Sequence, residues 1–178
     1  MKTYLTYGSA MAGGGFVLVL VLYILGFHSD ASKLSIAQWV QGCVGLGIGI
    51  VCIVLGTKAR RANVPAEDEF GYGSALGTGV MITLVAALIG IVTNLIYMQV
   101  INPGMTDLMM QAQIAKWEAA GLSSARIDQA EGIMRKMMSA PIQAAFGFCF
   151  GMVFGTIISL ITAAFLKRPA KDELQSVS

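Results

Sequence analysis

The chain has 178 residues, of which 56% are hydrophobic and 12% are charged, and its formal net charge is +2. Ordinary soluble domains carry about a quarter charged residues, so this chain has more apolar surface than one small soluble core can bury. The composition therefore excludes an ordinary soluble globular protein and indicates a membrane protein. No nucleic-acid partner is expected.

Four long segments of the chain contain no Asp, Glu, Lys, Arg or His: residues 8–27, 36–56, 77–101 and 141–166. Each reaches the length of about 20 residues that a helix needs to cross the hydrocarbon core of a bilayer. Continuous apolar runs are typical of spanning helices, whereas barrel strands are short and alternate. The sequence predicts an all-α membrane protein with four transmembrane helices in a single domain, 1–178, that ends in a cytoplasmic tail, 167–178.

The long link between the third and fourth spans predicts two further helices. Helix breakers stand at its start, in the NPG of Asn102–Gly104, and at its middle, in the GLSS of Gly121–Ser124. Between and after these breaks, apolar residues recur at helical spacing opposite charged ones. Thr106 is the expected N-cap of the first helix, and Ser123 or Ser124 that of the second. We therefore expect an amphipathic helical hairpin at about 104–138.

Basic residues near the span ends predict the orientation, because Lys and Arg are retained on the cytoplasmic side. They are dense after the second and fourth spans and diluted over the long third link; the dense groups are Lys58, Arg60 and Arg61, and Lys167, Arg168 and Lys171. Both termini and the 57–72 link are thus expected to be cytoplasmic, and the hairpin extracytoplasmic.

Small residues recur every four positions along the fourth span and along the third. Such ridges let membrane helices approach closely, and spans two, three and four are expected to pack through them. The predicted helix-packing residues are Gly147, Gly151, Gly155, Ser159 and Ala163 in the fourth span, and Ala75, Gly79, Thr83, Ala87, Gly90 and Asn94 in the third.

The apolar face of the hairpin is rich in methionine, which suits an adaptable contact surface. The candidate partner contacts are Met105, Met109, Trp117, Met134 and Met137. The alternative for the same residues is packing against the protein's own helices.

No catalytic chemistry is expected, because the spans hold no Asp, Glu, Lys, Arg or His to act as acid, base or metal ligand. The acidic Glu67–Glu69 cluster is interpreted as a solvated turn, and the glycine-rich 71–79 segment lacks the lysine of a phosphate-binding loop. His28 is interpreted as an interfacial residue without function. The sequence therefore predicts no enzyme, no catalytic residue, no cofactor and no metal site.

The chain resembles the DUF4199 family of bacterial integral membrane proteins over nearly its whole length. The resemblance rests on YGSAMAGGG, EFGYGSALGTGVMITLVAALIG, IYMQVINPGM and GLSSARIDQAEGIMRKMMSAP, in this order. The family pattern has an acidic residue soon after the serine of GLSS, where this chain has Ala125 and Arg126. The resemblance implies a four-span fold in a bacterial membrane and no established activity.

These observations predict a non-enzymatic, multi-pass protein of the bacterial inner (cytoplasmic) membrane. It is expected to be an accessory or scaffolding subunit of a larger membrane complex or homo-oligomer, with lipid and another membrane protein or a second copy as partners. The alternative is a small pore or transporter formed by oligomerisation. A polar lumen lined by Gln41, Thr83 and Asn94 would favour that alternative, and a closed bundle would favour scaffolding.

Overall fold

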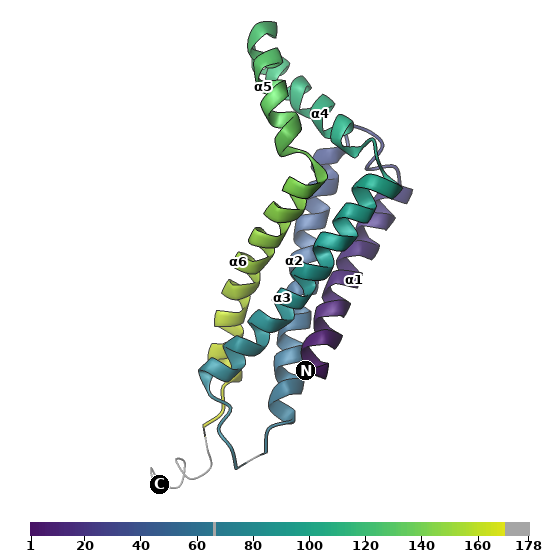
Figure 1. Ribbon diagram of the computed structural model, residues 1–178. Helices are drawn as coiled ribbons and strands as arrows, with labels where there is room; N and C mark the ends of the chain where they lie inside the picture. The colour runs from purple at the N-terminus through teal and green to yellow at the C-terminus, as the bar shows by residue number, and fades with distance from the viewer. Residues whose placement is uncertain (66, 170–178) are drawn as a thin grey trace. The chain divides into compact units, whose positions relative to one another are not determined.

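The computed structural model describes residues 1–65 and 67–169, so most of the predicted tail, residues 170–178, lies outside the described residues. The described chain is helical, and its elements follow one another as Figure 1 shows. They are α1 Lys2–Ile24, α2 Leu34–Ala62, α3 Tyr72–Ile96, the π-helical turn η1 Tyr97–Ile101, α4 Met105–Ala119, α5 Ser124–Met137 and α6 Ala140–Leu166.

The prediction of four spans is confirmed. Helices α1, α2, α3 with η1, and α6 are each long and apolar enough to cross a membrane. Helix α2 extends beyond its predicted end at residue 56 and runs to Ala62, past Arg60 and Arg61. Basic side chains in the last turn interact favourably with the partial negative charge at a helix C-terminus, so the charges that bound the apolar segment do not stop the helix.

Both predicted breaks in the third link occur. The helical segment ends at Ile101, directly before NPG, and α4 ends two residues before Gly121, whose φ of +77° only glycine adopts readily. The predicted cap of α4 is wrong. Helix α4 begins at Met105 with Gly104 as its N-cap, while the Thr106 hydroxyl donates to the carbonyl of Met138 at 3.4 Å.

The N-terminus of α5 partly matches its prediction. Ser123 takes the N-cap position with an extended backbone, but its side chain makes no capping hydrogen bond. The start of α5 is therefore placed by backbone geometry, without the side-chain contribution that a serine cap can make.

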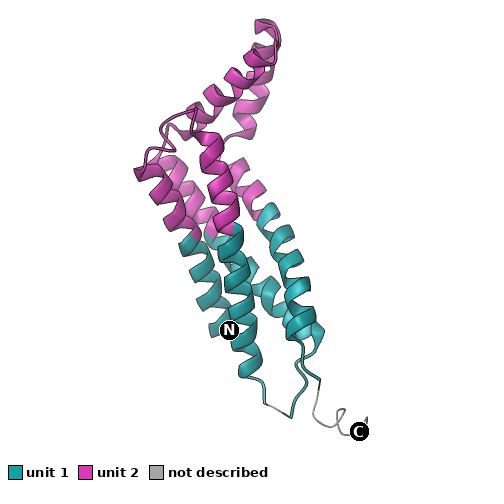
Figure 2. Ribbon diagram, turned by 180° about the vertical axis from the view of Figure 1, so that it is seen from behind, with its two compact units in different colours: residues 1–14, 46–89, 149–178 teal, residues 15–45, 90–148 magenta. Residues whose placement is uncertain are grey.

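The described chain divides into two compact units, each built from parts of all four spans (Figure 2). Unit 1 comprises residues 1–14, 46–89 and 149–178, and unit 2 comprises residues 15–45 and 90–148. The most buried apolar side chains of unit 1 include Ile53, Phe70 and Ile82. Those of unit 2 include Leu34 and Met110.

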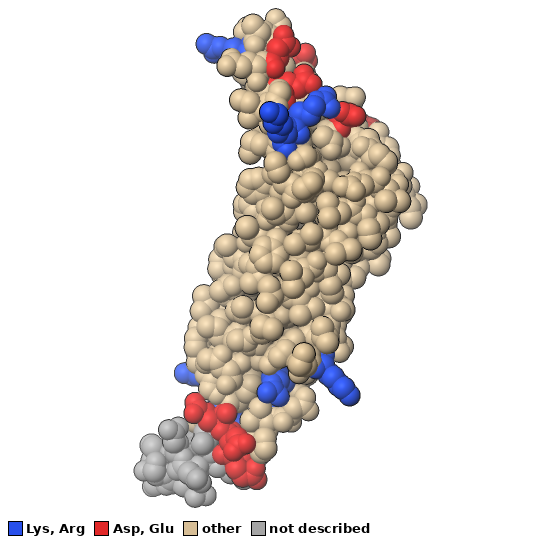
Figure 3. All heavy atoms as spheres, viewed as in Figure 1, with Lys and Arg blue, Asp and Glu red and all other residues tan. Residues whose placement is uncertain are grey.

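Large apolar side chains also cover the outer surface of the spans. Phe150 is 62% exposed and Phe165 is 81% exposed, and at most a third of any span's most apolar window is buried. Figure 3 shows Lys, Arg, Asp and Glu atoms over the α4–α5 hairpin in unit 2 and over the α2–α3 link in unit 1. Outward apolar faces of this extent suit lipid rather than water.

Candidate functional site

Helices α3 and α6 cross closely within unit 1, through residues that the sequence predicts for packing. A Cβ placed on Gly155 would overlap the side chain of Thr83, at 2.8 Å from its Cβ. A Cβ placed on Gly79 would lie 2.7 Å from the Cβ of Ser159 and 3.1 Å from Cγ2 of Ile53. Each helix therefore offers a glycine to the hydroxyl-bearing residue of the other, which lets the two backbones approach.

The hydroxyl groups at this crossing are satisfied within their own helices. Thr83 Oγ1 donates to the Gly79 carbonyl at 3.0 Å, and Ser159 Oγ donates to the Gly155 carbonyl at 2.6 Å. Thr83 and Ser159 are both fully buried. Both hydroxyls at the crossing therefore bond to carbonyls of their own helices, and neither faces a water-filled path.

Contact along the predicted ridges is confined to one end. Ala75 and Ala163 are buried in a cluster with Phe70, which extends the crossing beyond Gly79 and Ser159. Toward the other end, a Cβ on Gly151 would have no neighbour within 4 Å among the described residues. Because helices that cross diverge on either side of the contact, a continuous ridge in sequence touches its partner over only part of its length.

The remaining predicted packing residues do not take part in this crossing. In unit 2, a Cβ on Gly90 or Gly147 would likewise meet nothing within 4 Å of the described chain. Asn94 is half-buried, and its Oδ1 has no partner among the described residues. Ala87, in unit 1, is half-buried. Gly90 and Gly147 therefore have open space beside them where the sequence predicts close packing.

Two glycines that the sequence analysis missed bring α1 and α2 onto α3 in unit 1. A Cβ on Gly8 would lie 2.7 Å from the Cβ of Val85, and one on Gly56 would overlap the end of Ile82. The signal was present in the small residues of YGSAMAGGG, but no periodic ridge marks Gly8 or Gly56. The first span therefore packs as closely against α3 as the fourth does.

Arg168 fastens the α2–α3 link to the end of α6, again within unit 1. The backbones of Phe70 and Arg168 pair through two hydrogen bonds of 2.9 and 2.8 Å. Arg168 Nη2 also donates to the carbonyls of Val64, Pro65 and Asp68 at 3.2, 2.6 and 3.3 Å. One guanidinium thus donates hydrogen bonds to link carbonyls that lie outside any helix, and these bonds hold the link in shape.

His28 is buried within unit 2, a contact that the sequence did not indicate. It is 3% exposed in unit 2, and its Nδ1 lies 2.5 Å from the hydroxyl of Tyr97. Asn102 Nδ2 donates to the His28 carbonyl at 3.1 Å and to the Tyr97 hydroxyl at 3.3 Å. Tyr97 also makes an edge contact with the ring of Tyr23. Burial lowers the pKa of His28 from its ordinary value of 6.5 and so favours the neutral imidazole.

This cluster lies where α3 becomes the π-helix η1, a type of irregularity that is frequent at functional sites. A neutral imidazole can accept a hydrogen bond from the Tyr97 hydroxyl at Nδ1, so hydrogen bonds join His28, Tyr97 and Asn102. The cluster therefore ties the α1–α2 link to the end of the third span. Sequence reasoning missed it because 69 residues separate His28 from Tyr97.

One ion pair, between Arg135 and Asp107, joins the two hairpin helices within unit 2. Arg135 on α5 donates to Asp107 on α4 at 2.5 Å and to Glu131 at 3.0 Å. Ile127 and Met110 are buried within the same unit. The hairpin is thus a folded element rather than a loop.

Most of the predicted partner contacts face other parts of unit 2. Met105 and Met109 accept from the side-chain amides of Asn102 and Gln143, each at 3.7 Å, and are half-buried. Trp117 and Met134 are also half-buried. Met137 is 45% exposed, and one turn earlier lies Ile133, which is 64% exposed. Ile133 was missed, although its spacing of four from Met137 would have indicated a common face.

The family described as "Protein of unknown function (DUF4199)" matches residues 6–168, nearly the whole chain. No curated protein matches the chain, and neither does any solved structure. The chain belongs to the DUF4199 family.

Proposed function

We propose that this protein is a non-enzymatic, accessory or scaffolding subunit of a larger membrane complex, located in the bacterial inner membrane. The observation that carries the proposal is the pair Ile133 and Met137, two exposed apolar side chains one turn apart on α5. They lie outside the four spans, on a hairpin held in shape by the Arg135–Asp107 ion pair. An apolar pair on a rigid element outside the bilayer favours a contact with another protein.

The charge of the hairpin favours a protein partner over a lipid surface. Between Met105 and Met137 the sequence has four acidic and four basic residues. Helices that lie on membranes concentrate Lys and Arg on their polar face to attract anionic lipid. A hairpin without that excess is better suited to a protein surface, which we take to be another subunit in the same membrane.

The polar residues of the spans favour scaffolding over transport. Thr83 is buried at the α3–α6 crossing and bonded to its own helix, so it is withdrawn from any solute path. Gln41 is on the exposed surface of α2. Coupled transporters place charged groups or histidines within the membrane, and the four apolar segments of this chain contain no Asp, Glu, Lys, Arg or His.

The orientation that we propose follows from the basic cluster at the end of α2. Lys58, Arg60 and Arg61 place the α2–α3 link in the cytoplasm by the positive-inside rule. With four spans, both termini then lie in the cytoplasm and the hairpin lies on the extracytoplasmic side. Its partner is accordingly expected to present an extracytoplasmic surface.

Site-specific photo-crosslinking in intact cells tests the proposal. A photoreactive amino acid is placed at Ile133, and in a separate strain at Asp128, which is also exposed but lies on another side of α5. We expect a single adduct of defined mass from position 133, absent from position 128, that contains a second membrane protein. Solute flux through vesicles that contain the purified protein is measured in parallel.

Three results would contradict the proposal. Equal, diffuse labelling from both positions would mean that the α5 face meets no defined partner. An adduct with the mass of two copies would indicate a homo-oligomer instead of a complex with a different protein. Solute flux that depends on Thr83 would favour the pore.

A further inference from the structure

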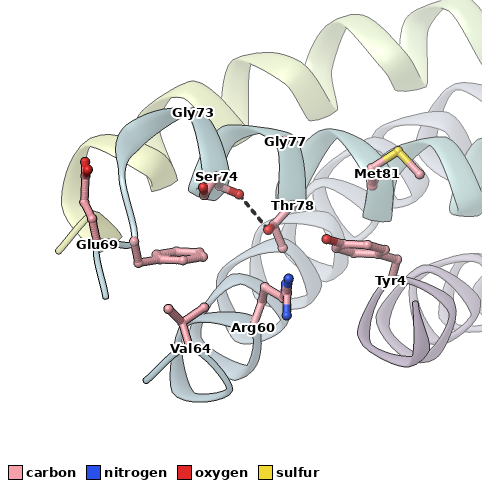
Figure 4. A pocket seen from close by; sticks show the side chains of 10 residues that line it. Tyr4, Arg60, Val64, Glu69, Gly73, Ser74, Gly77, Thr78 and Met81 are labelled. Carbon is pink, nitrogen blue, oxygen red and sulfur yellow. Dashed lines mark hydrogen bonds between the residues drawn. The ribbon is translucent and has the colours of Figure 1, made fainter. Parts of the chain in front are cut away.

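Unit 1 contains a pocket of about 310 Å³ whose lining does not include the residues of the α3–α6 crossing (Figure 4). Helix α1 contributes Tyr4, α2 contributes Arg60, and the first turns of α3 contribute Ser74 and Thr78. This volume lies at the lower end of the range for small-molecule sites. It suits one compact group rather than a large ligand.

The polar lining of the pocket is dominated by hydrogen-bond donors. The Arg60 side chain extends toward Thr78 and Tyr4 in Figure 4. Its guanidinium makes no ion pair or hydrogen bond with the residues that the structure describes. The Thr78 hydroxyl donates to the Ser74 carbonyl at 2.7 Å, so the donors left for a ligand are Arg60 and the hydroxyls of Tyr4 and Ser74. A donor-rich pocket with one cation selects an anion.

The one acidic side chain in the lining is placed apart from the cation. Glu69 stands at the far end of the view from Arg60, with its carboxylate turned away (Figure 4). A Cβ on Gly71 would lie 2.6 Å from Glu69 Oε1, which shows that this side chain folds back over its own loop. Glu69 therefore does not neutralise Arg60.

Part of the pocket wall is bare backbone. Gly73 and Gly77, one turn apart on α3, line the pocket, and a Cβ on either would meet nothing within 4 Å of the described chain. The rest of the wall is apolar and includes Phe70 and Met81. The pocket thus combines a cationic, donor-rich part with an apolar part, as an amphiphile would require.

The position of the pocket along the helices indicates where its ligand comes from. Arg60 lies two residues before the end of α2, and Ser74 lies two residues after the start of α3. Both spans leave the hydrocarbon core at this level, where phospholipid headgroups lie. Basic pockets between spanning helices on the cytoplasmic side are typical binding sites for anionic headgroups.

We propose that this pocket binds the phosphate of an anionic phospholipid, with Arg60 as the charged anchor and Tyr4 and Ser74 as further donors. The guanidinium can engage two phosphate oxygens at once. The acyl chains then leave along the bare α3 surface at Gly73 and Gly77. This proposal is independent of the accessory role and holds whichever partner the hairpin binds.

Lipid titration of the purified full-length protein tests the proposal. Phosphatidylglycerol and, separately, phosphatidylcholine are added to the protein in mild detergent, and bound lipid is counted by native mass spectrometry. The variants are Arg60→Gln, and Arg61→Gln as the matched control that removes the same charge from a residue outside the pocket. We expect Arg60→Gln to weaken phosphatidylglycerol binding about fivefold, the effect of one basic group at an anionic surface, and Arg61→Gln to have little effect.

A second variant fills the pocket without touching the charge. Gly77→Leu places a side chain where no protein atom lies within 4 Å of the Cβ, so the fold is kept while the site is occupied. We expect it to lower phosphatidylglycerol binding as Arg60→Gln does. Equal losses for Arg60→Gln and Arg61→Gln, or full binding by Gly77→Leu, would overturn the proposal. So would displacement of the lipid by inorganic phosphate at comparable concentration, which would assign the pocket to a soluble anion.

Discussion

The closest contact between α3 and α6 provides the sharpest test of the packing. Replacing Gly155 by Ala adds a single methyl group against Thr83. The clash cannot be relieved by rotating a side chain, because the two Cβ positions, 2.8 Å apart, are set by the backbones. The Thr83 rotamer is also held by its bond to Gly79. The helices must therefore separate.

The size of the effect follows from two opposing contributions. Overpacking of this kind costs about 1–3 kcal/mol, and a clash between two Cβ atoms belongs at the upper end of that range. Alanine improves intrinsic helix propensity over glycine by about 1 kcal/mol. The net loss is about 2 kcal/mol, which for a chain of this size lowers the Tm by ~4–8 °C.

Gly151→Ala is the matched control, because it makes the same substitution one turn earlier on the same helix. Its new methyl group would meet nothing within 4 Å of the described chain, so the propensity gain stands alone and the Tm should stay level or rise slightly. Thermal melts in mild detergent, read by size-exclusion chromatography, measure both variants. If Gly155→Ala melts at or above the temperature of Gly151→Ala, the inferred α3–α6 crossing is wrong.

Three other predictions concern the link, the buried histidine and the orientation. Arg168→Ala removes three carbonyl contacts and should speed amide hydrogen exchange of the α2–α3 link about tenfold, whereas Lys167→Ala should not. The pKa of His28 is lowered in the folded state, so its stabilisation is complete above pH 6.5 and is lost as the pH falls; the Tm advantage of wild type over His28→Asn should shrink accordingly, and a constant advantage would contradict the assignment. In a cysteine-free background, an impermeant thiol reagent on spheroplasts should label Gln111→Cys but not Glu67→Cys, both exposed positions, and the reverse pattern would invert the topology.

Local sequence patterns predicted the helices well. A span is recognised from its own uncharged residues, and the breaks at NPG and GLSS depend on the backbone chemistry of proline and glycine within a few positions. The spans and the two hairpin helices were therefore within reach of sequence reasoning. The shape of the α2–α3 link was not within reach, since the Arg168 side chain that contacts its carbonyls lies about 100 positions away.

Contacts between distant segments explain the other misses. The small-residue pattern identified Gly155 and Ser159 but also Gly151, because periodicity gives the face of a helix and not the point where a neighbour crosses it. The buried contact of His28 was missed because its partner Tyr97 belongs to another span. The Arg60 pocket was missed for the same reason, since its lining comes from three helices.

The alternation of glycine and hydroxyl residues at the α3–α6 crossing also fixes the register of the two helices. Gly79 lies against Ser159, and Gly155 lies against Thr83, so the bare backbone of each glycine faces a side chain of the other helix. A slip of one turn in one direction would set Thr83 against Ser159, with two side chains in the space of one. A slip of one turn in the other direction would set Gly79 against Gly155 and leave a gap between the backbones. Both mismatches are unfavourable, the first through overlap and the second through lost contact. The crossing thus favours a single alignment of the two helices, although the Thr83 and Ser159 hydroxyls bond within their own helices.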